Sequence, residues 1–269
     1  MAATDGQMSA STSAPSQNAW RRRPPPPPLP RPDHFIALRV PPAASQPAFD
    51  VLHASLGALG FGATLVDSAA AHVTLGVLRL SAASPNNGAQ EEETSPPVDP
   101  TRLASAVAAL RTAGAALRGS GPLALTLGPG VSTFGQRVVY LEAGDGSGGA
   151  SLRAVEAAVR GALEGVGLVV GEGAGGPVAA AHGTRRNRRP RQPQQIFTPH
   201  VTVAKTWSGG RVKAIPPSAV SSAVAELQAC GWERASFVAG TLQLCAMGGR
   251  QAGQYYRVVE EVEFGGASI

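Results

Sequence analysis

The tripeptide His-Val-Thr occurs twice in the chain, at residues 72–74 and at residues 200–202. In a β-strand the side chains of residues i and i+2 point to the same face, so each copy is predicted to present an imidazole beside a hydroxyl. The valine between them is then expected to point into the core. If the two strands meet, four side chains form one site. The candidate catalytic residues are His72, Thr74, His200 and Thr202.

Two imidazoles and two hydroxyls are suited to phosphodiester chemistry. An imidazole titrates at about pH 6.5, so one neutral ring can take a proton from a ribose hydroxyl or a water while a second, protonated ring gives one to the leaving oxygen. Threonine hydroxyls can donate to the non-bridging phosphate oxygens, where negative charge concentrates. We therefore expect a hydrolase, specifically a phosphodiesterase, that needs no metal and no other cofactor.

Two other interpretations of the motif remain open. A single His-x-Thr in a strand is common and usually structural, so two structural copies are one alternative. A two-histidine metal site is the other, although neither strand contains an Asp or Glu that would supply a third ligand.

The apolar pattern predicts the elements that must position these residues. Residues 46–60 carry Phe49, Leu52, Leu56 and Leu59 at helical spacing. Further helices are expected at residues 100–118, 150–166 (with Leu152, Val155, Val159 and Leu163 on one face) and 216–229. Strands are expected at residues 34–40, 72–80, 122–128, 136–142, 196–207, 234–247 and 254–264. The order strand, helix, HVT strand appears at residues 33–80 and again around residues 150–206, which indicates two lobes facing each other.

Composition bounds the class of protein. The chain has 269 residues, 43% hydrophobic, with 33 Gly and 23 Pro, which allows one large domain or two small lobes plus unpacked linker. No run of roughly 18 or more apolar residues occurs, so no membrane partner is expected. The two cysteines, Cys230 and Cys245, exclude a disulfide scaffold and a cysteine-based zinc site. Each is interpreted as a small buried hydrophobe.

Two segments are predicted to lie outside the packed domain. Residues 1–31 form a disordered, proline-rich arm. Residues 173–195 form a low-complexity insertion, and its five arginines carry as much positive charge as the formal net charge of the whole chain, +5. The insertion is a nuclear address, a tether for RNA or a solvated loop, and all three interpretations stay open. We expect a cytoplasmic or nuclear protein, with organelle targeting through the Ser- and Ala-rich start as an alternative.

Beyond the two tripeptides, the chain resembles the 2H phosphoesterase superfamily (LigT-like or 2′,5′ RNA ligase-like proteins), which is named for its two HxT motifs. It is most similar to the nucleotide-binding domain of the A-kinase anchoring protein 7/18 branch. The resemblance covers about residues 32–266, the domain expected here. The matching blocks are RPDHFIALRV, AHVTLGVLRL, STFGQRVVYLEAGDG, GLVVGE, FTPHVTVAKT and LQLCAMGGRQAGQYYRVVEEVEFG.

This resemblance implies an α/β fold of the α+β type with two lobes, in which two sheets form a central cleft with one HxT strand on each side. It implies activity on 2′,5′-linked oligoadenylates or 2′,3′-cyclic phosphate RNA ends, or alternatively AMP or CMP binding without turnover. The expected partner is a nucleotide or short RNA, bound by a monomer. A helix that binds protein kinase A regulatory subunits is not visible. By position, the resemblance adds the substrate-binding residues Phe134, Gly135, Lys205 and Tyr256, with packing as the alternative role of the tyrosine.

Overall fold

The structure is a computed structural model that describes residues 32–81, 97–147, 151–168, 197–206, 212 and 214–265. Two expected segments, the N-terminal arm (residues 1–31) and the basic insertion (residues 173–195), lie outside the described residues. Residues Arg31–Ile269 belong to one compact unit, and both HVT motifs lie in it.

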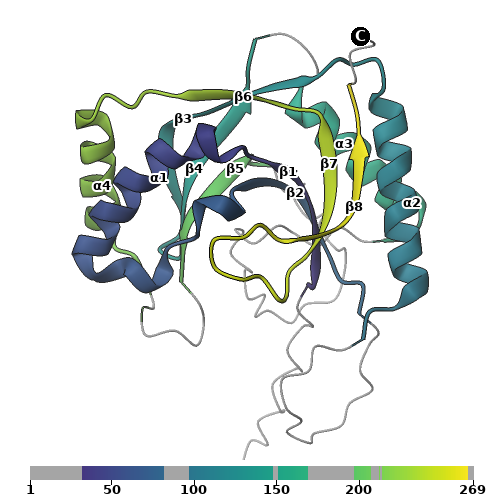
Figure 1. Ribbon diagram of the computed structural model, residues 1–269, viewed down its shortest axis with the longest axis horizontal. Helices are drawn as coiled ribbons and strands as arrows, with labels where there is room; N and C mark the ends of the chain where they lie inside the picture. The colour runs from purple at the N-terminus through teal and green to yellow at the C-terminus, as the bar shows by residue number, and fades with distance from the viewer. Residues whose placement is uncertain are drawn as a thin grey trace, which may run out of the picture. The chain divides into compact units, whose positions relative to one another are not determined.

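Within the described residues, eight strands form two four-stranded sheets in which all neighbours are antiparallel (Figure 1). The first sheet has the order β2 (His72–Leu78), β1 (His34–Arg39), β7 (Thr241–Ala246), β8 (Arg257–Glu263). The second has the order β5 (His200–Lys205), β4 (Val138–Asp145), β3 (Leu123–Phe134), β6 (Ala235–Ala239). Each HVT motif therefore begins an edge strand of its own sheet. The predicted α+β class is confirmed.

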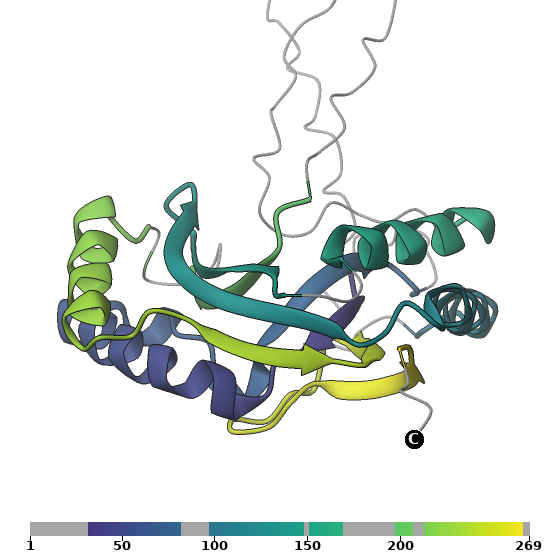
Figure 2. The same cartoon turned by 90° about the horizontal axis from the view of Figure 1, so that it is seen from above.

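The four α-helices begin at signals that the sequence contains. They are α1 (Pro42–Leu56), α2 (Pro100–Leu117), α3 (Leu152–Gly165) and α4 (Pro217–Ala229). Three of them start with proline, whose fixed φ and missing N–H suit a first turn. The side chains of Asp99 and Ser151 accept backbone N–H groups at the starts of α2 and α3. Figures 1 and 2 show α1 with α4 on one side of the sheets and α2 with α3 on the other.

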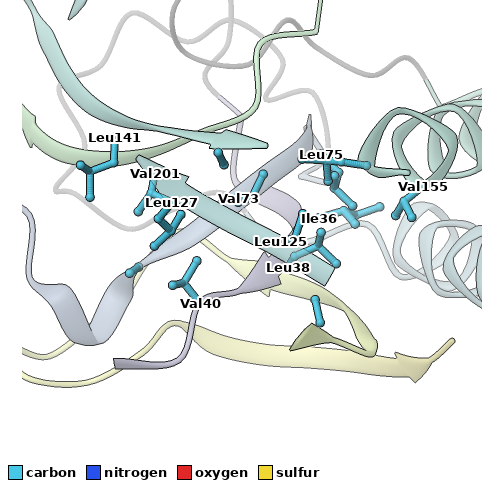
Figure 3. Packing of buried hydrophobic residues seen from close by; sticks show 14 of the residues in the cluster. Ile36, Leu38, Val40, Val73, Leu75, Leu125, Leu127, Leu141, Val155 and Val201 are labelled. Carbon is cyan, nitrogen blue, oxygen red and sulfur yellow. The ribbon is translucent and has the colours of Figure 1, made fainter. Parts of the chain in front are cut away.

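Both sheets and all four helices contribute to one hydrophobic core (Figure 3). Val73 and Val201, the central residues of the two motifs, have no exposed surface and lie in this core, as the strand period predicts. Burying one such side chain contributes about 1.5–3 kcal/mol. The predicted core face of α3 is also confirmed, because Leu152, Val155, Val159 and Leu163 are all buried. The core thus anchors each motif from behind and leaves the histidine and threonine on the opposite face.

The repeat of strand, helix and HVT strand is present in three dimensions. In the first copy β1 and β2 flank α1, and in the second β4 and β5 flank α3. In both copies the HVT strand pairs with the strand that precedes the helix, and the pairing is antiparallel. The second copy starts at residue 138 rather than at residue 150.

Three sequence-based expectations are wrong in detail. The single strand expected at residues 234–247 is interrupted at Gly240, where the chain leaves β6 in the second sheet and enters β7 in the first. Leu59 does not extend the apolar face of α1, because the α-helix ends at Leu56 and a glycine-containing π-turn (Gly57–Phe61) follows; the Leu59 side chain is 49% exposed.

The third wrong expectation is that both cysteines are buried. Cys245 is buried, as expected, and burial raises the pKa of its thiol to about 11. Cys230 is exposed, because it lies at the C-terminal cap of α4 rather than on the core face. No helix among the described residues is long and apolar enough to cross a membrane.

Candidate active site

The two HVT strands have the same local geometry. In each motif the valine is buried while the histidine and threonine are half-buried on the opposite face. Each strand then contains a β-bulge directly after the threonine, at Leu75 in β2 and at Val203 in β5. A bulge shifts the alternation of side chains by one residue. The fifth residue after the histidine, Lys205 in β5, therefore returns to the face of the motif.

The structure brings these two strands next to each other (Figure 1). The segment just before β2 joins β5 directly, since the Val66 N–H donates to the Val203 carbonyl at 2.8 Å and Leu65 forms a bridge with Ala204. His72 and His200 are close enough for positive charge on His200 to lower the pKa of His72. The four candidate catalytic residues thus lie together on one face of the molecule.

Both motif histidines are oriented by the backbone in the same way. The Nδ1 atom of His72 lies 2.7 Å from the carbonyl oxygen of Ala70, and that of His200 lies 2.8 Å from the carbonyl oxygen of Thr198. A carbonyl oxygen only accepts hydrogen bonds, so Nδ1 carries the proton in each neutral ring and Nε2 carries the lone pair. Among the described residues nothing hydrogen-bonds to either Nε2 atom. Both of these atoms are therefore placed to exchange protons with a ligand.

The electrostatic surroundings hold both rings neutral. The pKa of His72 is about 4, lowered first by burial and then by positive charge on His200, Lys205 and Arg250. Burial also lowers the pKa of His200, and the charge of Lys205 acts in the same direction. The hydrogen bonds to backbone carbonyls oppose these effects without cancelling them. Both imidazoles are thus predominantly neutral at pH 7, which is the state required of a general base.

Aromatic rings surround each imidazole. Phe35 stacks on His72 with ring centroids 4.7 Å apart, and Tyr256 contacts the same ring edge-on at 5.4 Å. Phe134 contacts His200 edge-on at 4.8 Å. Tyr140, which lies across from Thr202 on the neighbouring strand β4, is 5.1 Å from His200. Phe35 and Tyr140 are buried and support the imidazoles from behind, whereas Phe134 and Tyr256 are half-buried and present apolar surface suited to stacking a nucleobase.

The four residues added by family resemblance occupy different parts of this face. Phe134 and Tyr256 each touch one of the two imidazoles. Lys205 is half-buried on β5, and burial lowers the pKa of its amine. Gly135 forms the β3–β4 turn with a φ of +58°, and no contact joins it to either histidine. Phe134, Lys205 and Tyr256 are therefore brought to the site, whereas Gly135 shapes the turn beside it.

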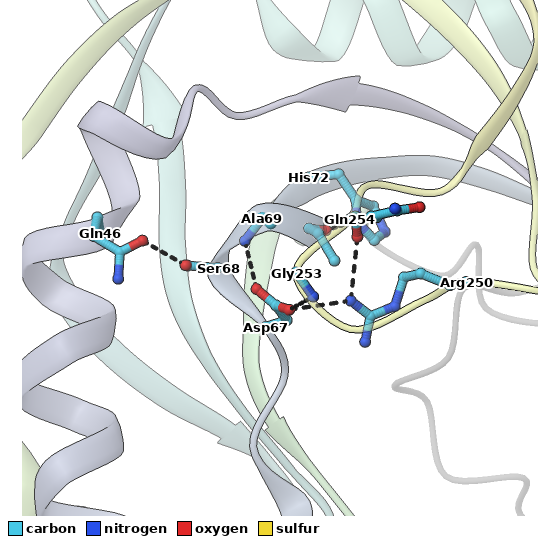
Figure 4. A network of polar contacts seen from close by, with 9 residues as sticks. Gln46, Asp67, Ser68, Ala69, His72, Arg250, Gly253 and Gln254 are labelled. Atoms are coloured by element: carbon cyan, nitrogen blue, oxygen red, sulfur yellow. Dashed lines mark hydrogen bonds and ion pairs between the residues drawn. The ribbon is translucent and has the colours of Figure 1, made fainter.

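Sequence reasoning missed several residues of this face. Phe35, Tyr140 and Arg250 belong to segments far from the motifs along the chain, and only the sheet pairing and the β7–β8 connection bring them in. Tyr140 is the one with a usable signal, because it lies in the alternating strand that follows the conspicuous Phe-Gly turn. Figure 4 shows how Asp67 holds the loop that carries Arg250 near His72.

The other described histidines do not join the pair of motif imidazoles. His34 is buried and its Nδ1 lies 2.8 Å from the Asp33 carboxylate, whereas His53 packs against Phe49 on α1 and lies near the backbone of Val203 behind the second motif. His182 lies outside the described residues. In the part of the chain that the structure describes, no three or more His, Cys, Asp or Glu side chains are arranged to hold a metal ion.

Comparison with known proteins assigns the family. A family model described as the AKAP7 2′5′ RNA ligase-like domain matches residues 32–264. Among solved structures, LigT of E. coli in complex with 3′-AMP is 13% identical, with 87% of this chain and 98% of that chain covered and a TM-score of 0.44. TT0787 of Thermus thermophilus is 14% identical, with 87% and 98% covered and a TM-score of 0.44. A comparison with curated proteins finds no match.

The fold and the paired HVT strands define a 2H phosphoesterase. The chain belongs to the family of AKAP7 2′5′ RNA ligase-like domains, which the family model matches over most of its length. The resemblance seen in the sequence is thereby confirmed, and phosphodiester chemistry is the class of activity that this membership implies.

Proposed function

We propose that the domain is a metal-independent phosphodiesterase that acts on 2′,5′-linked oligonucleotides or on 2′,3′-cyclic phosphate ends of RNA. The observation that carries this proposal is the matched orientation of the two imidazoles, in which each Nδ1 binds the backbone and each Nε2 is left for a ligand. The description of the family as 2′5′ RNA ligase-like supports the choice of linkage.

We assign the role of general base to His72, because its ring is unprotonated at neutral pH. Its pKa of about 4 keeps Nε2 unprotonated at neutral pH, so it takes a proton from a ribose hydroxyl or a water as that oxygen bonds to phosphorus. The bond from phosphorus to the leaving oxygen breaks, and His200, in its protonated form, gives that oxygen a proton. The anionic phosphate favours protonation of His200 once the substrate is bound. Thr74 and Thr202 donate hydrogen bonds to the non-bridging oxygens.

The test is hydrolysis of 2′,5′-oligoadenylate and of 2′,3′-cyclic nucleotides in the presence of EDTA. We expect the wild-type protein to hydrolyse at least one of these substrates. His72→Gln and His200→Gln are each expected to lower kcat by ~10²–10⁴-fold, the usual contribution of a general acid or base. Arg153→Gln is the control, because Arg153 is an exposed residue of α3 outside the motifs and its loss leaves kcat unchanged. Variants of the two motif histidines that turn over as fast as wild type show that the assignment is wrong.

A nucleotide-binding module without turnover is the second candidate. The lowered pKa of both motif histidines favours it, because the free protein then holds no protonated acid at neutral pH. Calorimetry with AMP and CMP, followed by analysis of the nucleotide after long incubation, separates the two functions. Binding with no product supports the module, whereas product formation that depends on both motif histidines supports the enzyme.

A further inference from the structure

A loop at residues 247–256 joins β7 to β8 and lies against the segment that precedes β2 (Figure 4). It carries Arg250 and ends in the tyrosine that contacts His72 edge-on. The loop belongs to neither HVT motif.

One carboxylate fixes both this loop and the imidazole of His72. Asp67 accepts a hydrogen bond from the N–H of Gly253 at 2.5 Å and forms an ion pair with Nη1 of Arg250 at 3.7 Å. Asp67 also accepts a hydrogen bond from the N–H of Ala69 at 2.9 Å. This bond begins the short turn that ends at Ala70, whose carbonyl oxygen orients the imidazole of His72. The guanidinium and the imidazole therefore have fixed positions relative to each other.

Arg250 has N–H donors that no described residue binds. Its polar contacts are the ion pair with Asp67 and a hydrogen bond from Nη1 to the Gln254 carbonyl at 3.4 Å. Within the described residues, no hydrogen bond or ion pair uses Nε or Nη2. A guanidinium presents paired donors that match two oxygens of a phosphate. The half-buried side chain is thus anchored at one end while its fork remains available.

The place of Arg250 relative to His72 decides which phosphate it fits. Its Cζ atom lies 5.6 Å from the centroid of Tyr256, and that ring lies 5.4 Å from the imidazole of His72. No direct contact joins Arg250 to His72, although the charge is near enough to lower the pKa of the histidine. The guanidinium is therefore at the margin of the proton-transfer site. A second phosphate of the bound oligonucleotide, next to the one that reacts, would lie there.

We propose that Arg250, held by Asp67, binds a second phosphate next to the one at the two histidines, so that the site selects oligonucleotides with two or more phosphates over those with a single phosphate. This inference rests on the proposed function, because it names the substrate class of that same site. Arg250 is here a specificity-determining residue, and Asp67 is a positioning residue.

The experiment compares 2′,5′-linked adenylyl adenosine, which has one phosphate, with the same dinucleotide carrying a second phosphate at its 5′ end or at its 2′ end. Both kcat/KM and Kd are measured. The wild-type protein prefers one of the doubly phosphorylated forms, and Arg250→Gln removes that preference, a loss of about tenfold or more. Arg250→Lys keeps the charge without the fork and retains part of the preference. Arg153→Gln, which removes an exposed arginine of α3, is the matched control and leaves all constants unchanged.

The outcomes separate this inference from the function on which it rests. If Arg250→Gln weakens the binding of the singly and doubly phosphorylated forms equally, or of neither form, the proposed second-phosphate site is wrong. Turnover by the wild-type protein still supports the proposed enzyme in that case. If wild type turns over no substrate, the proposed enzyme fails, and the Kd values alone decide the role of Arg250. If no dinucleotide binds, the second-phosphate site is overturned, and hydrolysis of 2′,3′-cyclic nucleotides alone decides the proposed function.

Discussion

Val77 and Lys205 occupy equivalent positions in the two HVT strands, five residues after a motif histidine and two after a bulged residue. Val77 packs in an apolar cluster with Phe35 and Cys245. Lys205 places a half-buried cation at the matching point, and its charge lowers the pKa of both His72 and His200. The two halves of the site therefore share their geometry and differ in charge, which gives an anionic ligand a preferred side.

Lys205→Met is expected to raise the pKa of both motif histidines while it keeps an apolar stem of similar length. The reason is that a positive charge opposing protonation is removed. NMR titration of the imidazole resonances measures both values. Arg153→Met on α3 removes a charge without changing either titration. Unchanged histidine pKa values in the lysine variant would contradict the electrostatic coupling described here.

Acid is expected to destabilise the protein through His72. Its pKa falls from 6.5 to about 4 on folding, so the unfolded chain binds more protons between these values and stability decreases as the pH falls through this window. The loss attributable to this group is on the order of 3 kcal/mol. Urea unfolding over a pH series is the measurement, with His72→Gln for comparison. The variant loses less stability than wild type over the same window, and identical pH dependences would rule the linkage out.

Thr74→Val and Thr202→Val are expected to lower kcat without unfolding the protein. Valine matches the shape of threonine but lacks the hydroxyl, and the loss of one hydrogen-bond donor to a developing anion costs about 10²–10³-fold. Among the described residues neither hydroxyl has another partner, so the free energy of unfolding changes little. Thr→Ser at either position restores the donor and most of the rate. Equal rates for the valine and serine variants would show that these hydroxyls do not contact the phosphate.

Gly135→Ala is expected to cost about 1–2 kcal/mol of stability. The residue has a left-handed φ of +58°, and a Cβ at this position meets nothing within 4 Å, so the cost is backbone strain alone. Gly135→Asn serves as the comparison, because asparagine tolerates this conformation better than alanine. Thermal unfolding ranks glycine first, asparagine next and alanine last. An alanine variant as stable as the wild type would mean that the turn changes its conformation.

Most of what concerns single segments could be predicted from the sequence. The alternation in the two HVT strands, the buried face of α3 and the starts of α2, α3 and α4 follow from patterns within a few residues, and the structure shows them, whereas α1 begins at Pro42 rather than at residue 46. The errors occur where a local pattern was extended too far. The apolar residues on both sides of Gly240 look like one strand, yet the chain there passes from one sheet to the other.

The sequence by itself determined the two pairs of imidazole and hydroxyl and the face on which each pair lies, because a strand alternates its side chains whatever surrounds it. Only the tertiary structure decided that the pairs meet, that Asp67 reaches Gly253 across 186 residues, and that His72 titrates near pH 4. These properties depend on which strands pair and on what covers each ring. Burial and charge are sums over neighbours in space, and most of those neighbours are far away along the chain.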